Sequence, residues 1–252
     1  MKKSKITHEA QFVDWEYIRR KKNVIFNEVL VECEEKRIRH IMGFRHGWNK
    51  EINAQFYAIV FFGHHESDRA MFWMTEEQKY HITFSNFVSL LRLGSADIDL
   101  PKLHDAGVLQ TREMHFMYPR NMRGSWEKVN GLYSYYGLLN RLFRKILTPR
   151  DGNTSDVTLF QRNLMATMRP GAPQFSVGDF IWQEIKNVSE NPQKICSYSP
   201  YIMFMIWKVT GIKFPNDVKH KPLRPPVNRT PRLPSLEAPE EEEHEIGEED
   251  QH

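Results

Sequence analysis

The stretch WNKEINAQFYAIVFFGHHESDRAMFWMTEEQKYHITFSNFVSLLRL, residues 48–93, decides the fold because three local signals follow one another in it. Asn49 can cap the first turn of a helix with its side chain. The apolar residues from Ile52 to Val60 then recur at the spacing of a single helical face. Gly63 ends this pattern, and the adjacent pair His64-His65 is predicted to lie in a surface loop.

The second half of the stretch predicts a hairpin and another helix. Residues 71–74 and 80–83 are rich in aromatic and β-prone side chains, and a polar segment separates them, as in a small β-hairpin. Apolar residues from Phe84 to Leu91 return to helical spacing, with Thr83 as a cap and Gly94 just beyond the end. Such short elements are stable only when they bury their apolar faces against one another.

The rest of the chain is read mainly as helices. The fold class is therefore mainly α, with a single helical domain and the small β-hairpin near residues 71–83. Capping residues, apolar spacing and the positions of proline and glycine predict a mostly helical pattern over residues 8–35. They also predict helices near 110–114, over 132–147, from 153–156 to 168, over 176–191 and over 199–210. Thr111 and Ser176 are the expected caps of the helices that they begin.

Composition divides the chain into four segments. Residues 1–7 are expected to be disordered, and 8–214 form the helical domain. Order is expected to end near Phe214. Residues 215–236 read as a basic, proline-rich linker, and 237–252 as an acidic disordered tail. The net charge is +3, but the tail holds nine acidic residues and no Lys or Arg, so residues 1–236 carry +12. A basic body favours binding to an acidic partner.

Several short motifs resemble the first-open-reading-frame proteins of Athila-type plant retrotransposons and their grass relatives, across roughly residues 45–227. They include Gln55-Phe56-Tyr57-Ala58, Trp73-Met74-Thr75, the 82–93 helix, residues 104–109, 112–114, 147–150 and 200–203, and 219–225. The resemblance implies a gag-like structural protein that self-associates and packages RNA, and it brings no active site with it. Arg92-Leu93 departs from the Gly-Leu or Gly-Phe of these relatives, which affects the end of that helix.

The sequence indicates no enzyme. Cys33 and Cys196 are too few for a zinc knuckle, and no aspartic-protease loop, phosphate-binding loop or nucleophile elbow occurs. Asp97, Asp99, His104 and Asp105 have no spacing typical of a metal site. We therefore predict no cofactor and no metal, and the sequence identifies no small-molecule substrate. No apolar run is long enough to cross a membrane, and the expected location is intracellular, in either the cytoplasm or the nucleus.

A basic and aromatic segment, residues 112–150, is the candidate binding site. It holds eight Lys and Arg against two Glu, with Tyr118, Trp126, Tyr133 and Tyr136 among them. Cations neutralise phosphates and aromatic rings stack on unpaired bases; alternatively, the rings are core and the cations only solvated. The predicted nucleic-acid-binding residues are Arg141, Arg144 and Lys145, with Arg120 and Arg123. The three on the 132–147 helix are spaced to share one solvent-facing side.

Two functions stay open from the sequence. The first is a gag-like structural protein that binds RNA or single-stranded DNA and forms homo-oligomers, with the acidic tail competing for the basic helix. The second is a protein–protein interaction module without a nucleic-acid role. The run Arg19-Arg20-Lys21-Lys22 is read as a solvated helix face in preference to a nuclear-import or nucleic-acid patch.

Overall fold

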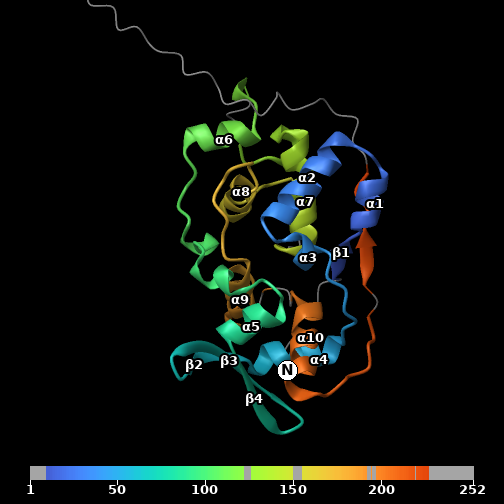
Figure 1. Cartoon of the computed structure of the whole chain (residues 1–252), viewed down its shortest axis with the longest axis vertical. Helices are drawn as coiled ribbons and strands as arrows, with labels where there is room; N and C mark the ends of the chain where they lie inside the picture. Colours follow the sequence, from blue (N-terminus) through green and yellow to red (C-terminus); the bar gives the residue numbers. More distant parts are fainter. Residues whose placement is uncertain are drawn as a thin grey trace, which may run out of the picture.

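Helices dominate the computed structural model, which describes residues 10–121, 126–149, 155–191, 194, 197–218 and 220–226. The α-helices are α1 (Trp15–Arg20), α2 (Val24–Glu35), α3 (Arg39–Met42), α4 (Lys50–Ile59), α5 (Phe84–Leu90), α6 (Thr111–Met117), α7 (Ser134–Ile146), α8 (Leu159–Ala166), α9 (Val177–Glu190) and α10 (Ser199–Thr210). Short 3-10 helices are η1 (Ser95–Asp99), η2 (Leu103–Asp105) and η4 (Val129–Gly131). In Figure 1 the sheet formed by β2 (Phe61–His65), β3 (Asp68–Thr75) and β4 (Gln78–Thr83) lies at one end of the molecule, next to α4 and α5. None of the described helices is long and apolar enough to span a bilayer.

Local capping signals place several helix starts as predicted. The Asn49 side chain accepts a hydrogen bond from the Ile52 N–H at 3.0 Å, and Thr83 accepts one from the Asn86 N–H at 3.3 Å. Ser176 does the same for α9 through the Asp179 N–H at 3.0 Å. Each bond satisfies a donor that the first turn of a helix would otherwise leave unpaired.

The predicted hairpin is part of a three-stranded antiparallel sheet. Its strands are β2 (Phe61–His65), β3 (Asp68–Thr75) and β4 (Gln78–Thr83), in the order β2-β3-β4. The loop predicted at His64-His65 is therefore wrong, because that pair belongs to β2, where His64 pairs with Arg69 and His65 with Asp68. A strand is recognised by side chains that alternate between its two faces. Strand β2 is short and has Gly63, which lacks a side chain, in its middle, so this alternation is not visible in its sequence.

The inner face of the sheet packs against helices through aromatic rings. Trp182 of α9 is central to this contact, because the rings of Phe62, Phe84 and Phe87 all lie 5.4–5.5 Å from its ring centroid, edge-on. Such edge-to-face pairs are favoured by the charge distribution of the rings. They fix β2 and α5 to α9 in one hydrophobic core.

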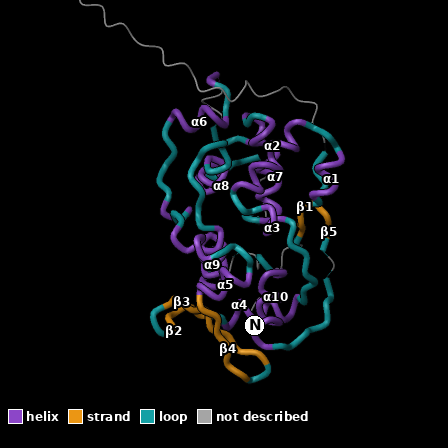
Figure 2. The backbone as a smooth tube through the Cα atoms, viewed as in Figure 1, coloured by secondary structure: helices purple, strands orange, loops and turns teal. Residues whose placement is uncertain are grey.

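The two ends of the described chain meet in a second, two-stranded sheet, which Figure 2 shows beside α1. Strand β1 (Gln11–Val13) runs parallel to β5 (Lys221–Leu223), with Phe12 opposite Pro222. The mostly helical pattern predicted for residues 8–35 is confirmed by α1 and α2, although β1 precedes them. The expectation that order ends near Phe214 is wrong, because β5 lies beyond it. A parallel pair separated by about two hundred residues leaves no local trace in the sequence. Residues 1–9 and 227–252, which include the acidic tail, lie outside the described residues.

His220 fixes the segment before β5 to the body. Its Nδ1 accepts a hydrogen bond from the His46 N–H at 3.2 Å, and its ring lies 5.9 Å from that of Phe12. Burial lowers the pKa of His220 to about 4, and the nearby charges of His46 and Arg45 act in the same direction. The neutral ring is thus the form that packs here at neutral pH.

Two helix starts differ from the prediction. Helix α8 begins at Leu159, where Thr158 and Gln161 form a capping box, and not at residues 153–156. Residues 150–154 are not described, and Asp156 forms an isolated bridge with Lys128. At α6 the cap is Gln110, whose N–H donates to the Glu113 carboxylate at 2.8 Å, and not Thr111.

The backbone at the end of α5 takes a conformation that favours glycine, although this chain has Arg92 at that position. The N–H of Arg92 donates to Ser89 and that of Leu93 to Val88, at 3.0 and 3.2 Å, which is the bond pattern of a Schellman motif. Arg92 adopts the left-handed conformation, with φ of 58°, that glycine takes without strain. An Arg at this position closes the helix at a cost in stability.

We expect Arg92→Gly to raise the free energy of unfolding by about 1 kcal/mol, because it relieves the left-handed strain at the helix end. Urea denaturation followed by circular dichroism measures this change. Arg92→Ala removes the same charge but keeps a Cβ, so it should give no gain. A gain of equal size in both variants would assign the effect to charge and contradict the conformational explanation.

Candidate nucleic-acid interface

Helix α7 is strongly amphipathic, as its sequence predicts. Its apolar residues Leu138, Leu139, Leu142 and Ile146 are buried, and the helix packs against α2, α8 and β1. A hydrogen bond to the end of α6 holds the start of α7 in place, because the Tyr133 N–H donates to the Met117 carbonyl at 2.9 Å. The remaining side of the helix, near its C-terminal end, faces solvent.

Two of the predicted cations lie on this solvent side. Arg141 and Lys145 are exposed and one helical turn apart. In the described part of the chain, neither side chain forms an ion pair with a carboxylate. Both are therefore accessible to an anionic ligand.

Arg144 does not share that side, and the prediction that all three cations face solvent is wrong. Its residue surface is only 8 % exposed, and its Nη1 donates to the Asp156 carbonyl at 3.1 Å. The segment after residue 154 therefore covers the helix at this position. Arg144 joins two parts of the chain, which is a structural role.

The other predicted site residues are not brought to the same place. Arg120 is exposed but follows α6, on the segment that meets the start of α7, whereas Lys145 lies near its end. Arg123 lies outside the described residues. Lys128, also in the basic segment, donates to the Asp156 carboxylate at 2.6 Å and is neutralised by it.

The aromatic residues of the segment serve mainly the core. Tyr118 and Tyr136 are both fully buried, so the alternative that these rings are core is correct for them. Trp126 and Tyr133 are half-buried and pack against the core. Stacking on unpaired bases therefore does not explain why Tyr118 and Tyr136 lie among the cations.

Exposed cations from other elements lie near the solvent-facing side of α7. Arg141 lines a shallow depression together with Asn23 and Pro226, so the end of α1 and the segment after β5 lie next to it. The ring of Tyr17 joins these two, because the Lys21 Nζ lies 5.0 Å and the Arg224 guanidinium 5.9 Å from its centroid. We define the basic face as the exposed cations Arg20, Lys21, Lys22, Arg141, Lys145 and Arg224.

The run at residues 19–22 is visible in the sequence, where it was expected to be a solvated helix face. The run alone could not indicate its neighbours, because Arg141 and Arg224 are more than a hundred residues away. Two cations near the run are balanced: Arg19 pairs with Glu16 at 2.9 Å, and Arg224 pairs with Asp14 at 2.8 Å. The basic face keeps a positive excess because Lys21, Lys22, Arg141 and Lys145 have no such pairs among the described residues.

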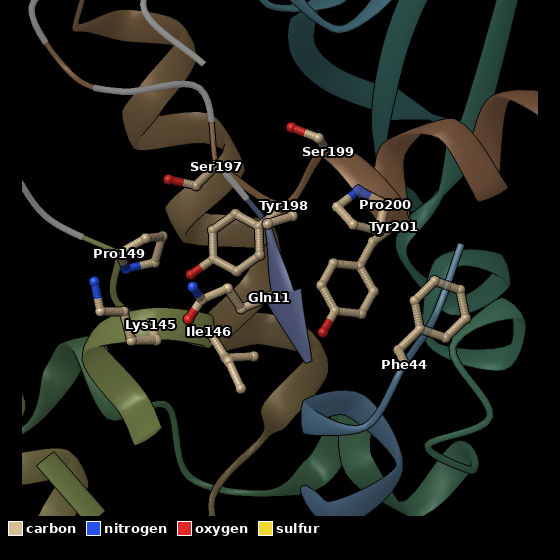
Figure 3. Close-up of a pocket in the computed structure, with 11 residues that line it drawn as sticks. Gln11, Phe44, Lys145, Ile146, Pro149, Ser197, Tyr198, Ser199, Pro200 and Tyr201 are labelled. Carbon is tan, nitrogen blue, oxygen red and sulfur yellow. The ribbon is translucent and has the colours of Figure 1, made fainter. Parts of the chain in front are cut away.

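Lys145 also borders a small cavity at the start of α10, which Figure 3 shows with Tyr198 and Tyr201 between Lys145 and Phe44. The Tyr198 hydroxyl donates to the Leu147 carbonyl, and that of Tyr201 to the Ile41 carbonyl at 2.5 Å. The cavity measures only about 20 Å³, room for about one water molecule. It therefore contributes to packing and holds no ligand.

No group of three or more metal-binding side chains converges within the described ranges. Comparisons with known protein families, with curated proteins and with solved structures give no match. The class that the coordinates define is a predominantly helical protein with a small antiparallel sheet and a basic face built from three separate parts of the chain.

Proposed function

We propose that this protein binds nucleic acid without sequence specificity through the basic face, as a gag-like structural protein. The observation that carries the proposal is that Arg141 of α7 lies beside Asn23 and Pro226. Next to these two residues in the chain stand exposed cations, of which Lys21 and Arg224 both lie against the ring of Tyr17. Lys and Arg side chains that meet from separate elements form a surface able to follow a phosphate backbone. Binding releases counterions from the nucleic acid, which supplies the free energy.

The flexible lysines of the basic face support non-specific binding. Contacts to phosphates position a protein on nucleic acid but carry no sequence information. Lys21, Lys22 and Lys145 have flexible side chains that act as point charges and fit many backbone geometries. RNA and single-stranded DNA are the expected ligands, with little preference between them.

A salt titration tests this function. We expect a fluorescein-labelled U20 oligonucleotide and the matching dT20 to bind the full chain with similar affinity at 50 mM salt, measured by fluorescence anisotropy. If six phosphates are contacted, log K should fall against log salt with a slope of about −4 for a single strand. No binding at 50 mM salt, or an affinity that does not depend on salt, would contradict the proposal.

Self-association is the second candidate function, and it rests on the outer face of the sheet. Phe61 is 60 % exposed and stacks on Phe72 at 4.8 Å, and the ring of His81 follows at 5.6 Å. A two-fold contact through this aromatic row would cover it with the same row of a second copy. Light scattering across the same salt series distinguishes this apolar contact, which should persist at high salt.

A further inference from the structure

A hollow of about 240 Å³ lies between η2, α6, α8 and the segment that follows α8. Its walls are mainly apolar, with Leu103, Leu109, Phe116, Met117 and Phe175 among them. Small-molecule sites typically measure about 300–1,000 Å³ and combine apolar walls with a few polar groups. This hollow is slightly smaller, so its occupant must be compact.

Two buried polar atoms at this hollow have no hydrogen-bond partner in the described part of the chain. They are the hydroxyl of Tyr136, which is fully buried, and the Oδ1 of Asn163, which is 4 % exposed. The Asn163 Nδ2 donates to the Ala106 and Gly107 carbonyls, at 3.2 and 3.0 Å, so only its acceptor end is unused. By contrast, the hydroxyl of neighbouring Tyr135 donates to the Met168 carbonyl at 2.8 Å.

Leaving such an atom unpaired costs about 1–3 kcal/mol. Two of them bordering one hollow therefore indicate groups that a ligand can satisfy. Tyr136 offers a donor, because burial raises its pKa to about 12 although the charge of Arg169 acts against this rise. Asn163 offers an acceptor, so the ligand must itself supply one donor.

The charge at the hollow favours an anion. The Arg169 guanidinium lies over the ring of Phe116, 4.3 Å from its centroid, and has no ion-pair partner among the described residues. Lys102 lies at the exposed rim. Glu113 is the one acid in the lining, and its carboxylate already accepts a hydrogen bond from the Gln110 N–H. The balance is one positive charge, which matches a monoanion.

We infer that this hollow binds a small aromatic carboxylic acid that also carries one hydroxyl or N–H donor. The carboxylate pairs with Arg169 and accepts a hydrogen bond from Tyr136, while the ring packs among Leu103, Phe116 and Phe175. The donor on the ligand satisfies the Oδ1 of Asn163. A rigid ring suits this site because little conformational entropy is lost when it binds.

A ligand series tests the assignment in the full chain. Isothermal titration calorimetry compares 4-hydroxyphenylacetate with phenylacetate, which lacks the donor, and with 4-hydroxyphenylacetamide, which lacks the charge. We expect 4-hydroxyphenylacetate to bind, and each of the other two to bind roughly tenfold more weakly or worse, because each leaves a polar group of the site unpaired. No binding of 4-hydroxyphenylacetate, or equal binding of all three, would overturn the proposal.

Two variants locate the contact. Tyr136→Phe removes a hydroxyl that has no protein partner, so it should weaken 4-hydroxyphenylacetate binding roughly tenfold while leaving the melting temperature unchanged or higher. Arg169→Gln should weaken binding of the acid but not of the amide. Tyr135→Phe is the matched control: it loses the bond to Met168, so it should lower the melting temperature without changing affinity. Unchanged affinity in both Tyr136→Phe and Arg169→Gln would place any binding elsewhere.

Discussion

Replacing Asp97 by Ala is expected to lower the free energy of unfolding by about 4 kcal/mol. Asp97 is buried, and its carboxylate holds the first turn of α9 from outside the helix. Its Oδ2 accepts from the Ser176 hydroxyl at 2.7 Å and the Gly178 N–H at 2.9 Å, and its Oδ1 from the Val177 N–H at 2.9 Å. The variant leaves these donors buried without an acceptor and removes a negative charge from the positive end of the helix.

Urea denaturation followed by tryptophan fluorescence measures this loss, since Trp182 lies on α9. Asp99→Ala is the matched control, because Asp99 belongs to the same 3-10 helix but is exposed, and it should change stability by less than about 0.5 kcal/mol. Asp97→Asn keeps one acceptor oxygen and should fall between the two. If Asp97→Ala and Asp99→Ala have equal effects, the carboxylate does not hold α9.

The same position shows what a single sequence can and cannot predict about the fold. Asn49, Thr83 and Ser176 were predictable as caps because each accepts from a backbone N–H three residues further on. Asp97 binds donors about eighty residues away, and only the tertiary structure brings them together. The β1–β5 pair is longer in range still, so a reading based on local periodicity placed the end of the domain too early.

The features of the candidate site were likewise predictable only where the local sequence determines them. Helical spacing correctly predicted that Arg141 and Lys145 share a side of α7. It could not predict that the segment carrying Asp156 packs over Arg144, because periodicity describes one helix and not its neighbours. The basic face and the hollow at Tyr136 arise between elements distant in sequence, so neither leaves a motif.

The double variant Arg141→Glu/Lys145→Glu is expected to lower the affinity for U20 about 100-fold at 50 mM salt and to reduce the salt slope by about 1.4. Each substitution replaces a cation that contacts phosphate with a carboxylate that repels it. Both side chains are exposed, so the melting temperature should change little. Arg144 is left intact, because its loss would unseat the segment at Asp156 and confuse binding with folding.

The matched control reverses the same number of charges on the other side of the molecule. Lys50 at the start of α4 and Lys79 on β4 are also exposed, and Figure 1 places both elements at the end far from α1. Lys50→Glu/Lys79→Glu lowers the net charge equally, so it shows the effect of overall charge alone. An equal loss of affinity in both double variants would mean that net charge, and not the basic face, attracts the nucleic acid. A loss confined to the α7 variant would show that phosphates bind where α1, α7 and the segment after β5 meet.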